Sequence, residues 1–187
     1  LATNLAQKKV KKGACVLNYN KVINLLKDDK NQVTGVLVED KETGEQKEIK
    51  GKVTINATGV FTNSIMKMND KAYKKYIVPS QGIHLVFDKS FLPSDYALMV
   101  PKTSDGRVLF AVPWHDKIIV GTTDTLIKSH SLEPIALESE IEFVLETAQR
   151  FLAKKPTRAD VLAVFAGLRP LAAPEKEGQS TKEVSRS

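Results

Sequence analysis

"VTINATGVFTNSI", residues 53–65, joins an alternating apolar run to a glycine and then becomes polar. Val53, Ile55 and Ala57 would share one face of a strand, and β-branched side chains suit the pleat of a sheet. Gly59 removes a side chain where that strand ends, which allows an unusual backbone angle or lets another molecule approach the main chain. The polar residues that follow predict a short helix, whose free N–H groups would suit an anionic ligand at the same place. An ordinary strand that ends in a glycine turn also explains the stretch.

The composition is that of a folded, globular chain. Of the 187 residues, 42% are hydrophobic and 27% are charged, close to the average of soluble folded proteins. This length is enough for one sizeable core or for one and a half typical domains. The apolar runs are much shorter than a bilayer span, and no signal peptide opens the chain. We therefore expect a cytoplasmic chain, and peripheral contact with the cytoplasmic membrane stays open.

The cysteine and histidine residues exclude several kinds of site. Cys15 is the one cysteine, so no internal disulfide forms, and its apolar surroundings predict a buried thiol. The three histidines are too widely spaced for a metal-ligand pattern, so no metal site is expected. The net charge of +6 comes largely from scattered lysines with few aromatic residues among them, which favours a solvated surface over a nucleic-acid partner.

The apolar pattern predicts secondary structure over most of the chain. Helical spacing in the first ten residues ends at Gly13, a typical C-terminal stop, and short strands with brief turns predict an antiparallel sheet between residues 76 and 124. The expected elements are a helix at 1–13, extended segments at 14–29, a hairpin-like unit at 33–59, strands at 83–87, 97–100, 107–114 and 117–125, a helix around 141–152 and a strand that begins near 160.

Individual polar residues at strand ends are the candidates for chemistry, because the chain has no G-x-G turn, P-loop or nucleophile elbow. His84 enters a strand, where it could exchange protons near neutral pH or be a satisfied, half-buried side chain. Arg169 stands between Leu168 and Pro170, so its long side chain extends from an apolar segment. Its guanidinium needs an anionic partner, either a protein carboxylate or a ligand's phosphate or carboxylate. Thr122–Asp124 could bind a ligand but are equally good turn formers.

Five segments, taken in order, resemble the FAD-dependent glycerol-3-phosphate dehydrogenases and oxidases of the D-amino-acid-oxidase-like flavoprotein superfamily. They are INATG at 55–59, QGIHLVF at 81–87, RVLFAVPW at 107–114, IIVGTTDT at 118–125 and FAGLRPL at 165–171. The resemblance covers nearly the whole chain. It implies removal of hydride from C2 of sn-glycerol 3-phosphate to N5 of FAD, which gives dihydroxyacetone phosphate, and transfer of the electrons to quinone or oxygen.

The resemblance also implies roles for residues of a substrate site. His84 matches a histidine near the substrate hydroxyl, a candidate base or orienting group. Arg169 matches a substrate-binding arginine, and Arg186 falls where the family has a second one, although the family there more often shows TRDY than VSRS. Thr122 matches a threonine close to flavin and substrate. Gln81 replaces a residue that is commonly basic in the family.

A second set of residues matches the part of the family that binds FAD. Ala14 and Val16 match a strand whose backbone meets the adenine end of the cofactor, and Ala57, Thr58 and Gly59 match the segment along it. If FAD lies against this backbone, the bare Cα of Gly59 has a function.

The implied fold is α/β, or more broadly α+β. We expect an incomplete Rossmann-type FAD-binding domain at 1–75, continued near 160–187. An antiparallel substrate-binding domain with flanking helices, which roofs the flavin ring, is expected at 76–160.

The glycine-rich turn that holds the FAD pyrophosphate in this family does not occur in the sequence. We therefore expect an internal fragment that by itself binds FAD weakly or not at all and has no turnover. A sheet without its first strand exposes ladder edges, so a homo-oligomer is also expected.

Two alternatives stay open. A related FAD-dependent amine or 2-hydroxy-acid oxidoreductase would use an arginine to bind a carboxylate. A non-catalytic module would bind anionic lipid or nucleic acid through its positive surface, and that binding would weaken with modest salt.

Overall fold

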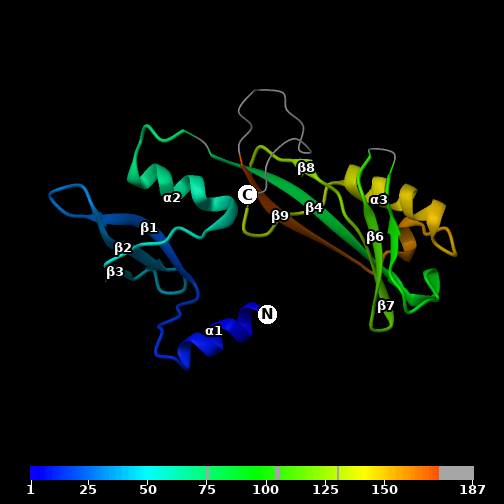
Figure 1. Cartoon of the computed structure of the whole chain (residues 1–187), viewed down its shortest axis with the longest axis horizontal. Helices are drawn as coiled ribbons and strands as arrows, with labels where there is room; N and C mark the ends of the chain where they lie inside the picture. The colour runs from blue at the N-terminus through cyan, green and yellow to red at the C-terminus, as the bar shows by residue number, and fades with distance from the viewer. Residues whose placement is uncertain (75, 104–105, 130, 173–187) are drawn as a thin grey trace. The chain divides into compact units, whose positions relative to one another are not determined.

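The chain folds into two compact units in the computed structural model, which describes residues 1–74, 76–103, 106–129 and 131–172 (Figure 1). The first unit is Leu1–Lys74 and the second is Lys75–Ser187. Each has its own β-sheet and at least one helix. In the described part of the chain, no helix is both long enough and apolar enough to cross a lipid bilayer.

The first unit begins with helix α1 (Ala2–Val10), as the helical spacing predicts. Gly13 follows with φ of 85°, a left-handed conformation that glycine adopts without steric cost, so the expected stop is confirmed. Strands β1 (Asn20–Lys27), β2 (Val33–Asp40) and β3 (Gln46–Lys50) then form an antiparallel sheet in that order. The hairpin between β2 and β3 confirms the expected hairpin-like unit.

One short helix packs on this sheet. The 3-10 helix η1 (Gly59–Phe61) leads directly into α2 (Thr62–Asn69), which contacts β1. Lys27 Nζ donates a hydrogen bond of 2.7 Å to the carbonyl of Asn69 and ties the helix end to the strand. The buried apolar side chains of the first unit are Leu25, Val38 and Val60.

Two expected strands of the first unit do not form. Residues 14–18 and 52–58 pair with no strand among the described residues, and Val53 and Ile55 are 77% and 81% exposed. Alternating apolar residues make a segment compatible with a strand, but a strand also needs a neighbour to satisfy its N–H and C=O groups. Cys15 lies in the first of these segments and is exposed, so the expectation of a buried thiol is wrong.

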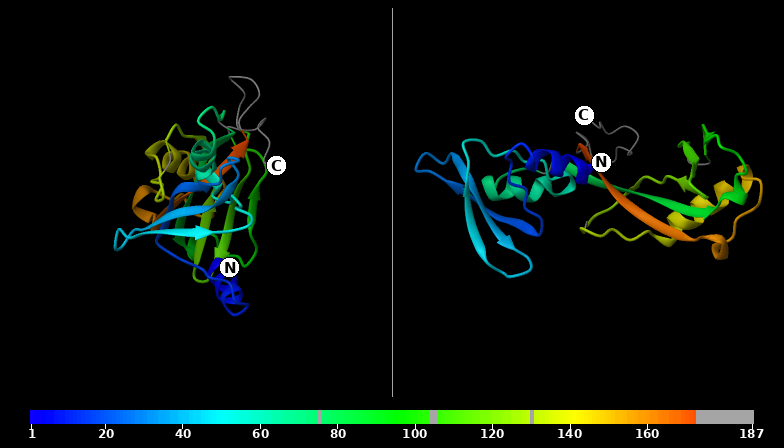
Figure 2. Two further views of the ribbon diagram at one scale, coloured as in Figure 1. Left: turned by 90° about the vertical axis from the view of Figure 1, so that its left-hand side faces the viewer. Right: turned by 90° about the horizontal axis from the view of Figure 1, so that it is seen from below.

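The second unit contains an antiparallel sheet of six strands, which confirms the antiparallel prediction. Its neighbours follow the order β5-β6-β7-β4-β8, and β9 pairs with β4 as well. The strands are β4 (Ile77–Asp88), β5 (Leu98–Val100), β6 (Leu109–Trp114), β7 (Lys117–Gly121), β8 (Thr125–Leu126) and β9 (Ala163–Ala172). The long strands β4 and β9 run side by side, as Figure 2 shows.

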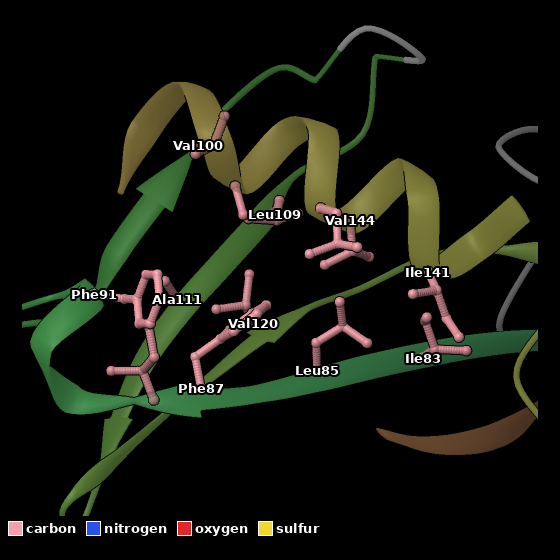
Figure 3. Packing of buried hydrophobic residues seen from close by; sticks show 13 residues of the cluster. Ile83, Leu85, Phe87, Phe91, Val100, Leu109, Ala111, Val120, Ile141 and Val144 are labelled. Atoms are coloured by element: carbon pink, nitrogen blue, oxygen red, sulfur yellow. The ribbon is translucent and has the colours of Figure 1, made fainter. Parts of the chain in front are cut away.

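Helix α3 (Glu138–Phe151) covers one face of this sheet (Figure 3). Its apolar stripe confirms the expected helix, and acidic residues in the first turn with Arg150 in the last complement the helix dipole. Ile83, Leu85 and Phe87 alternate along β4 toward the helix and are fully buried. Burial of each such side chain contributes about 1.5–3 kcal/mol. The remaining buried core is formed by Phe91, Val100, Leu109, Ala111, Ile118, Val120, Ile141, Val144, Leu145 and Ala148.

Strand β9 lies in the second compact unit. That the region near 160–187 continues the FAD-binding domain stays a prediction from the family resemblance, and residues 173–187 lie outside the described residues. Strand β9 pairs with β4 from Ile77↔Ala172 to Val86↔Ala163, so each of its ten residues faces a residue of β4. This long ladder satisfies the backbone of both strands and accounts for where β9 lies. The division at 74/75 falls one residue before the expected boundary.

Candidate functional site

The candidate site lies on the face of the second sheet that α3 does not cover. Side chains alternate between the two faces of a strand, so His84 points away from the core that its neighbours Ile83 and Leu85 form. In the sheet register, His84 faces Phe165 of β9 on one side and Gly121 of β7 on the other. Arg169 lies further along β9, opposite Ser80.

His84 is held between an aromatic ring and bare backbone. Its imidazole stacks on the ring of Phe165, with 5.1 Å between ring centroids and 14° between planes. A Cβ at Gly121 would lie 2.6 Å from Cδ2 of His84, so the absence of a side chain there makes room for the imidazole. Partial burial, and then the positive charge of Arg169, lower the pKa of His84 from 6.5. The imidazole is therefore neutral near pH 7 and able to accept a proton.

Arg169 is held by the loop that follows β7. Its Nη1 donates to the carbonyl of Thr123 at 3.1 Å, and its Nη2 donates to Oγ1 of Thr122 at 2.9 Å. A guanidinium has five N–H donors, so within the described part of the chain these two bonds leave three for other acceptors. The side chain is 30% exposed and can therefore meet a ligand.

Asp124 supplies a protein carboxylate near this arginine. Its Oδ1 lies 4.0 Å from Nη1 of Arg169, and the same oxygen accepts a hydrogen bond from Oγ of Ser80. The sequence leaves open a protein carboxylate or an anionic ligand as the partner of Arg169, and Asp124 is such a protein carboxylate. The Asp124 carboxylate offsets part of the guanidinium charge, while the free donors stay open to a ligand.

A buried polar network on the other face supports the same loop. Thr123 Oγ1 donates to Oε1 of Glu140 at 2.8 Å and accepts the N–H of Ile83 at 3.1 Å. Gln81 Nε2 donates to Oε2 of Glu140 at 2.7 Å. The side chain of Gln81 lies on the face of β4 that α3 covers, whereas His84 lies on the opposite face. The glutamine that replaces the family's basic residue is therefore not beside His84.

Glu140 is charged although it is only 3% exposed. Burial raises the pKa of its carboxyl, but hydrogen bonds from the N–H of Leu137 and from Gln81, Thr125 and Thr123 outweigh that effect and hold the pKa below 4.5. Sequence reasoning missed this role, because an acidic residue in the first turn of a helix is adequately explained by the helix dipole.

The residues proposed to contact a cofactor lie in the first unit. Ala14, Val16, Ala57 and Thr58 are exposed, and Thr58 lines a groove of about 410 Å³. Gly59 has φ of 57°, so of the two reasons offered for a glycine here the structure shows the unusual backbone angle, and a Cβ built on it would meet no atom within 4 Å. Bare, exposed backbone before a helix fits the close approach of a large anionic cofactor.

The structure therefore divides the predicted residues into two groups. His84, Thr122 and Arg169 share one face of the second unit, whereas the five cofactor candidates belong to the first. Arg186 lies outside the described residues. Gly82, Gly121 and Phe165 were missed because their importance depends on strand register, which local sequence does not show.

Comparison with known proteins connects this geometry to a family. A family model described as "FAD dependent oxidoreductase" matches residues 1–181. The mitochondrial glycerol-3-phosphate dehydrogenase of Schizosaccharomyces pombe is 38% identical over 178 residues, covering 90% of this chain and 27% of the relative. The enzyme SDP6 of Arabidopsis thaliana, with the same described activity, is 40% identical over 175 residues, covering 93% and 28%.

Solved structures agree with this assignment. The glycerol-3-phosphate dehydrogenase from Bacillus halodurans, complexed with FAD, superposes with a TM-score of 0.83 and 33% identity, over 89% of this chain and 34% of that one. L-proline dehydrogenase from P. horikoshii, at 19% identity and a TM-score of 0.59 over 89% and 41%, shares the fold. The chain spans about a quarter to a third of the length of its glycerol-3-phosphate dehydrogenase relatives. The family match over nearly the entire length shows that this chain belongs to the FAD dependent oxidoreductases.

Proposed function

We propose that the second unit binds glycerol 3-phosphate and takes part in its FAD-dependent oxidation to dihydroxyacetone phosphate. The observation that carries this proposal is the placement of a partly exposed guanidinium, held by two hydrogen bonds, and a neutral imidazole on one face of one sheet. The glycerol-3-phosphate dehydrogenase relatives support the choice of substrate.

Arg169 is the proposed donor to the phosphate. Its bonds to Thr122 and Thr123 fix the plane of the guanidinium before any ligand arrives. A preorganised fork gives charge-assisted hydrogen bonds to phosphate oxygens with little further loss of side-chain entropy. Thr122 Oγ1 accepts a hydrogen bond from Nη2 of Arg169 and is therefore a second candidate contact for the substrate.

His84 is the proposed acceptor of the proton from the C2 hydroxyl. An alcohol that loses a hydride must also lose the hydroxyl proton, and a neutral imidazole is the form that can take it. The ring is held between Phe165 and Gly121, which restricts its orientation. Partial burial and, after it, the positive charge of Arg169 lower the pKa of His84 and so favour the neutral, basic form before reaction.

FAD, when bound, supplies the acceptor for the hydride. The residues proposed to hold it are Ala14, Val16, Ala57, Thr58 and Gly59, because the first four are exposed and a Cβ on Gly59 would meet no atom within 4 Å. We propose that this chain by itself binds FAD weakly or not at all. Quinone or oxygen as the final acceptor and peripheral membrane contact are further proposals that rest on the family resemblance, and self-association is a proposal that rests on exposed sheet edges.

A carboxylate substrate is the second candidate. Asp124 lies 4.0 Å from Arg169 and offsets part of its charge, which reduces the advantage of a phosphate dianion over a singly charged carboxylate. A 2-hydroxy acid would then place its carboxylate on Arg169 and its hydroxyl toward His84.

Nuclear magnetic resonance titration of the purified chain tests both candidates. Glycerol 3-phosphate should shift the side-chain signals of Arg169 and His84, whereas glycerol should not, because it lacks the anion. Lactate tests the carboxylate alternative. The Arg169→Gln variant, which keeps a polar side chain without the charge, should lose the response. A wild-type chain that responds to none of these ligands would contradict the proposed site.

A further inference from the structure

Gly82 lies directly under the guanidinium of Arg169. A Cβ built on Gly82 would be 2.3 Å from Nη2, 2.4 Å from Nη1 and 2.7 Å from Cζ of that side chain. All three distances are shorter than real van der Waals contacts, so the arginine occupies the space that any other residue at 82 would fill.

Backbone conformation does not explain a glycine at this position. Gly82 is within strand β4 and, unlike Gly59, does not have a positive φ that disfavours other residues. Glycine in a strand interior weakens the strand, and it often marks a place where another group approaches the backbone closely. Here the approaching group is the guanidinium.

The strand partner of Gly82 provides a contrast within the same sheet. Gly167 of β9 faces Gly82 in the register, and a Cβ built on Gly167 would meet no atom within 4 Å. Neither glycine has a positive φ. The two positions thus share a strand pair and differ in whether a side chain would collide with Arg169.

We propose that Gly82 is a positioning residue for anion binding: its bare Cα lets the Arg169 guanidinium lie flat on β4, where Thr122 and Thr123 hold it. This inference rests on the proposed function of Arg169 as the phosphate donor. It identifies the residue that sets the height of the guanidinium above the sheet, and hence the position of the anion.

An added methyl group would move the guanidinium and leave the strand in place. The colliding atoms are the far end of a flexible side chain, so the arginine can shift by roughly 1 Å to reach ordinary contact distance. That shift would break or lengthen its bonds to Thr122 and Thr123, now 2.9 and 3.1 Å. Loss of this preorganisation weakens anion binding even though the charge is retained.

The test compares Gly82→Ala with Gly167→Ala in the full chain. In Gly82→Ala we expect a changed Arg169 Nε–H signal and an affinity for glycerol 3-phosphate about ten-fold lower or worse, as loss of charge-assisted hydrogen bonds implies. Gly167→Ala should leave both unchanged. An unchanged Arg169 signal and affinity in Gly82→Ala would overturn the inference.

A double-mutant cycle covers the case in which Gly82→Ala loses stability. If the collision with Arg169 is the cause, the same alanine should be tolerated once Arg169→Ala has removed the guanidinium. Equal destabilisation in both backgrounds would overturn the inference. Failure of the proposed function is a separate result. The wild-type chain would then bind no glycerol 3-phosphate, and a changed Arg169 signal in Gly82→Ala would show that Gly82 positions the guanidinium but not that it serves anion binding.

Discussion

Partial burial and one neighbouring charge determine the charge of His84. Its pKa is lowered first by partial burial and then by the guanidinium of Arg169. The same arginine that is proposed to hold the anion therefore adds to the effect of burial in keeping the proposed base neutral. A single residue thus affects both binding and proton transfer, and the two effects can be separated by measuring the imidazole directly.

Replacing Arg169 with Gln should raise the pKa of His84. The substitution removes a nearby positive charge, and the remaining burial should still hold the value below 6.5. The measurement is a titration of the His84 ring signals by nuclear magnetic resonance. Arg150→Gln, which removes an exposed arginine at the end of α3, is the control and should have no effect. A pKa that falls or stays constant in Arg169→Gln would contradict this electrostatic account.

The pKa of His84 also makes the second unit less stable in acid. When the pH falls below 6.5, His84 becomes protonated in the unfolded chain but stays neutral in the folded chain, because its pKa is lower there. The free energy of unfolding therefore decreases as the pH falls, until the pH reaches the pKa of folded His84. His84→Asn cannot titrate and should lack this contribution. Urea unfolding followed by fluorescence of Trp114, the one tryptophan, measures the difference. Parallel pH profiles for the two proteins would rule out the effect.

Among the secondary-structure elements, helix α3 contacts both the hydrophobic core and the loop that holds Arg169. Its apolar stripe packs on one face of the sheet, and Glu140 in its first turn accepts hydrogen bonds from Gln81 on β4 and Thr123 in the loop after β7. The carbonyl of Thr123 in turn accepts a hydrogen bond from Arg169. The helix therefore stabilises the loop that holds the arginine on the opposite face.

Glu140→Ala should lower the free energy of unfolding by about 3 kcal/mol, because it leaves several buried donors without an acceptor. It should also weaken the binding of glycerol 3-phosphate, since the Thr122–Thr123 segment loses its support. Glu142→Ala, on the exposed face of the same helix, should change stability by less than about 0.5 kcal/mol. Chemical denaturation measures both variants. Equal, small effects would show that the buried network contributes little.

At the scale of the whole molecule, the two units differ in how much apolar surface they bury. Three apolar side chains are buried in the described part of the first unit, whereas the second has a contiguous buried cluster beneath α3. Stability rises with the apolar area removed from water. The proposed substrate residues therefore belong to the better-packed unit, and the proposed cofactor residues belong to the other.

Hydrogen exchange should detect this difference. Backbone amides of β1 and β2 should exchange faster than those of β4 and β7, because less buried apolar surface opposes their opening. Equal protection in both sheets would contradict the expected ranking.

Leu85→Ala, which truncates a fully buried side chain, should lower the free energy of unfolding of the second unit by about 2–5 kcal/mol. Leu162→Ala removes a leucine that is 55% exposed and is the control.

The sequence by itself determined the elements whose signal is local. Helical spacing identified α1 and α3, turn residues identified the β2–β3 hairpin, and the polar residues after Gly59 correctly indicated a short helix. His84, Thr122 and Arg169 could be named as candidates because polar residues at the ends of apolar strands are conspicuous in the sequence. These features depend on interactions within a few residues.

Only the tertiary structure decided which strands have partners and which side chains meet. Val53 and Ile55 alternate as a strand would but lie exposed, whereas β9 pairs with β4 more than seventy residues away in the sequence. The β4–β9 register puts Gly82 beneath Arg169 and His84 against Phe165. Ladder hydrogen bonds and side-chain collisions join residues that are distant in the chain, and a one-residue change of register would exchange the two faces of the strand. For that reason the sequence could name candidate residues such as His84 and Arg169, but it could not show their geometry or the parts played by Gly82 and Phe165.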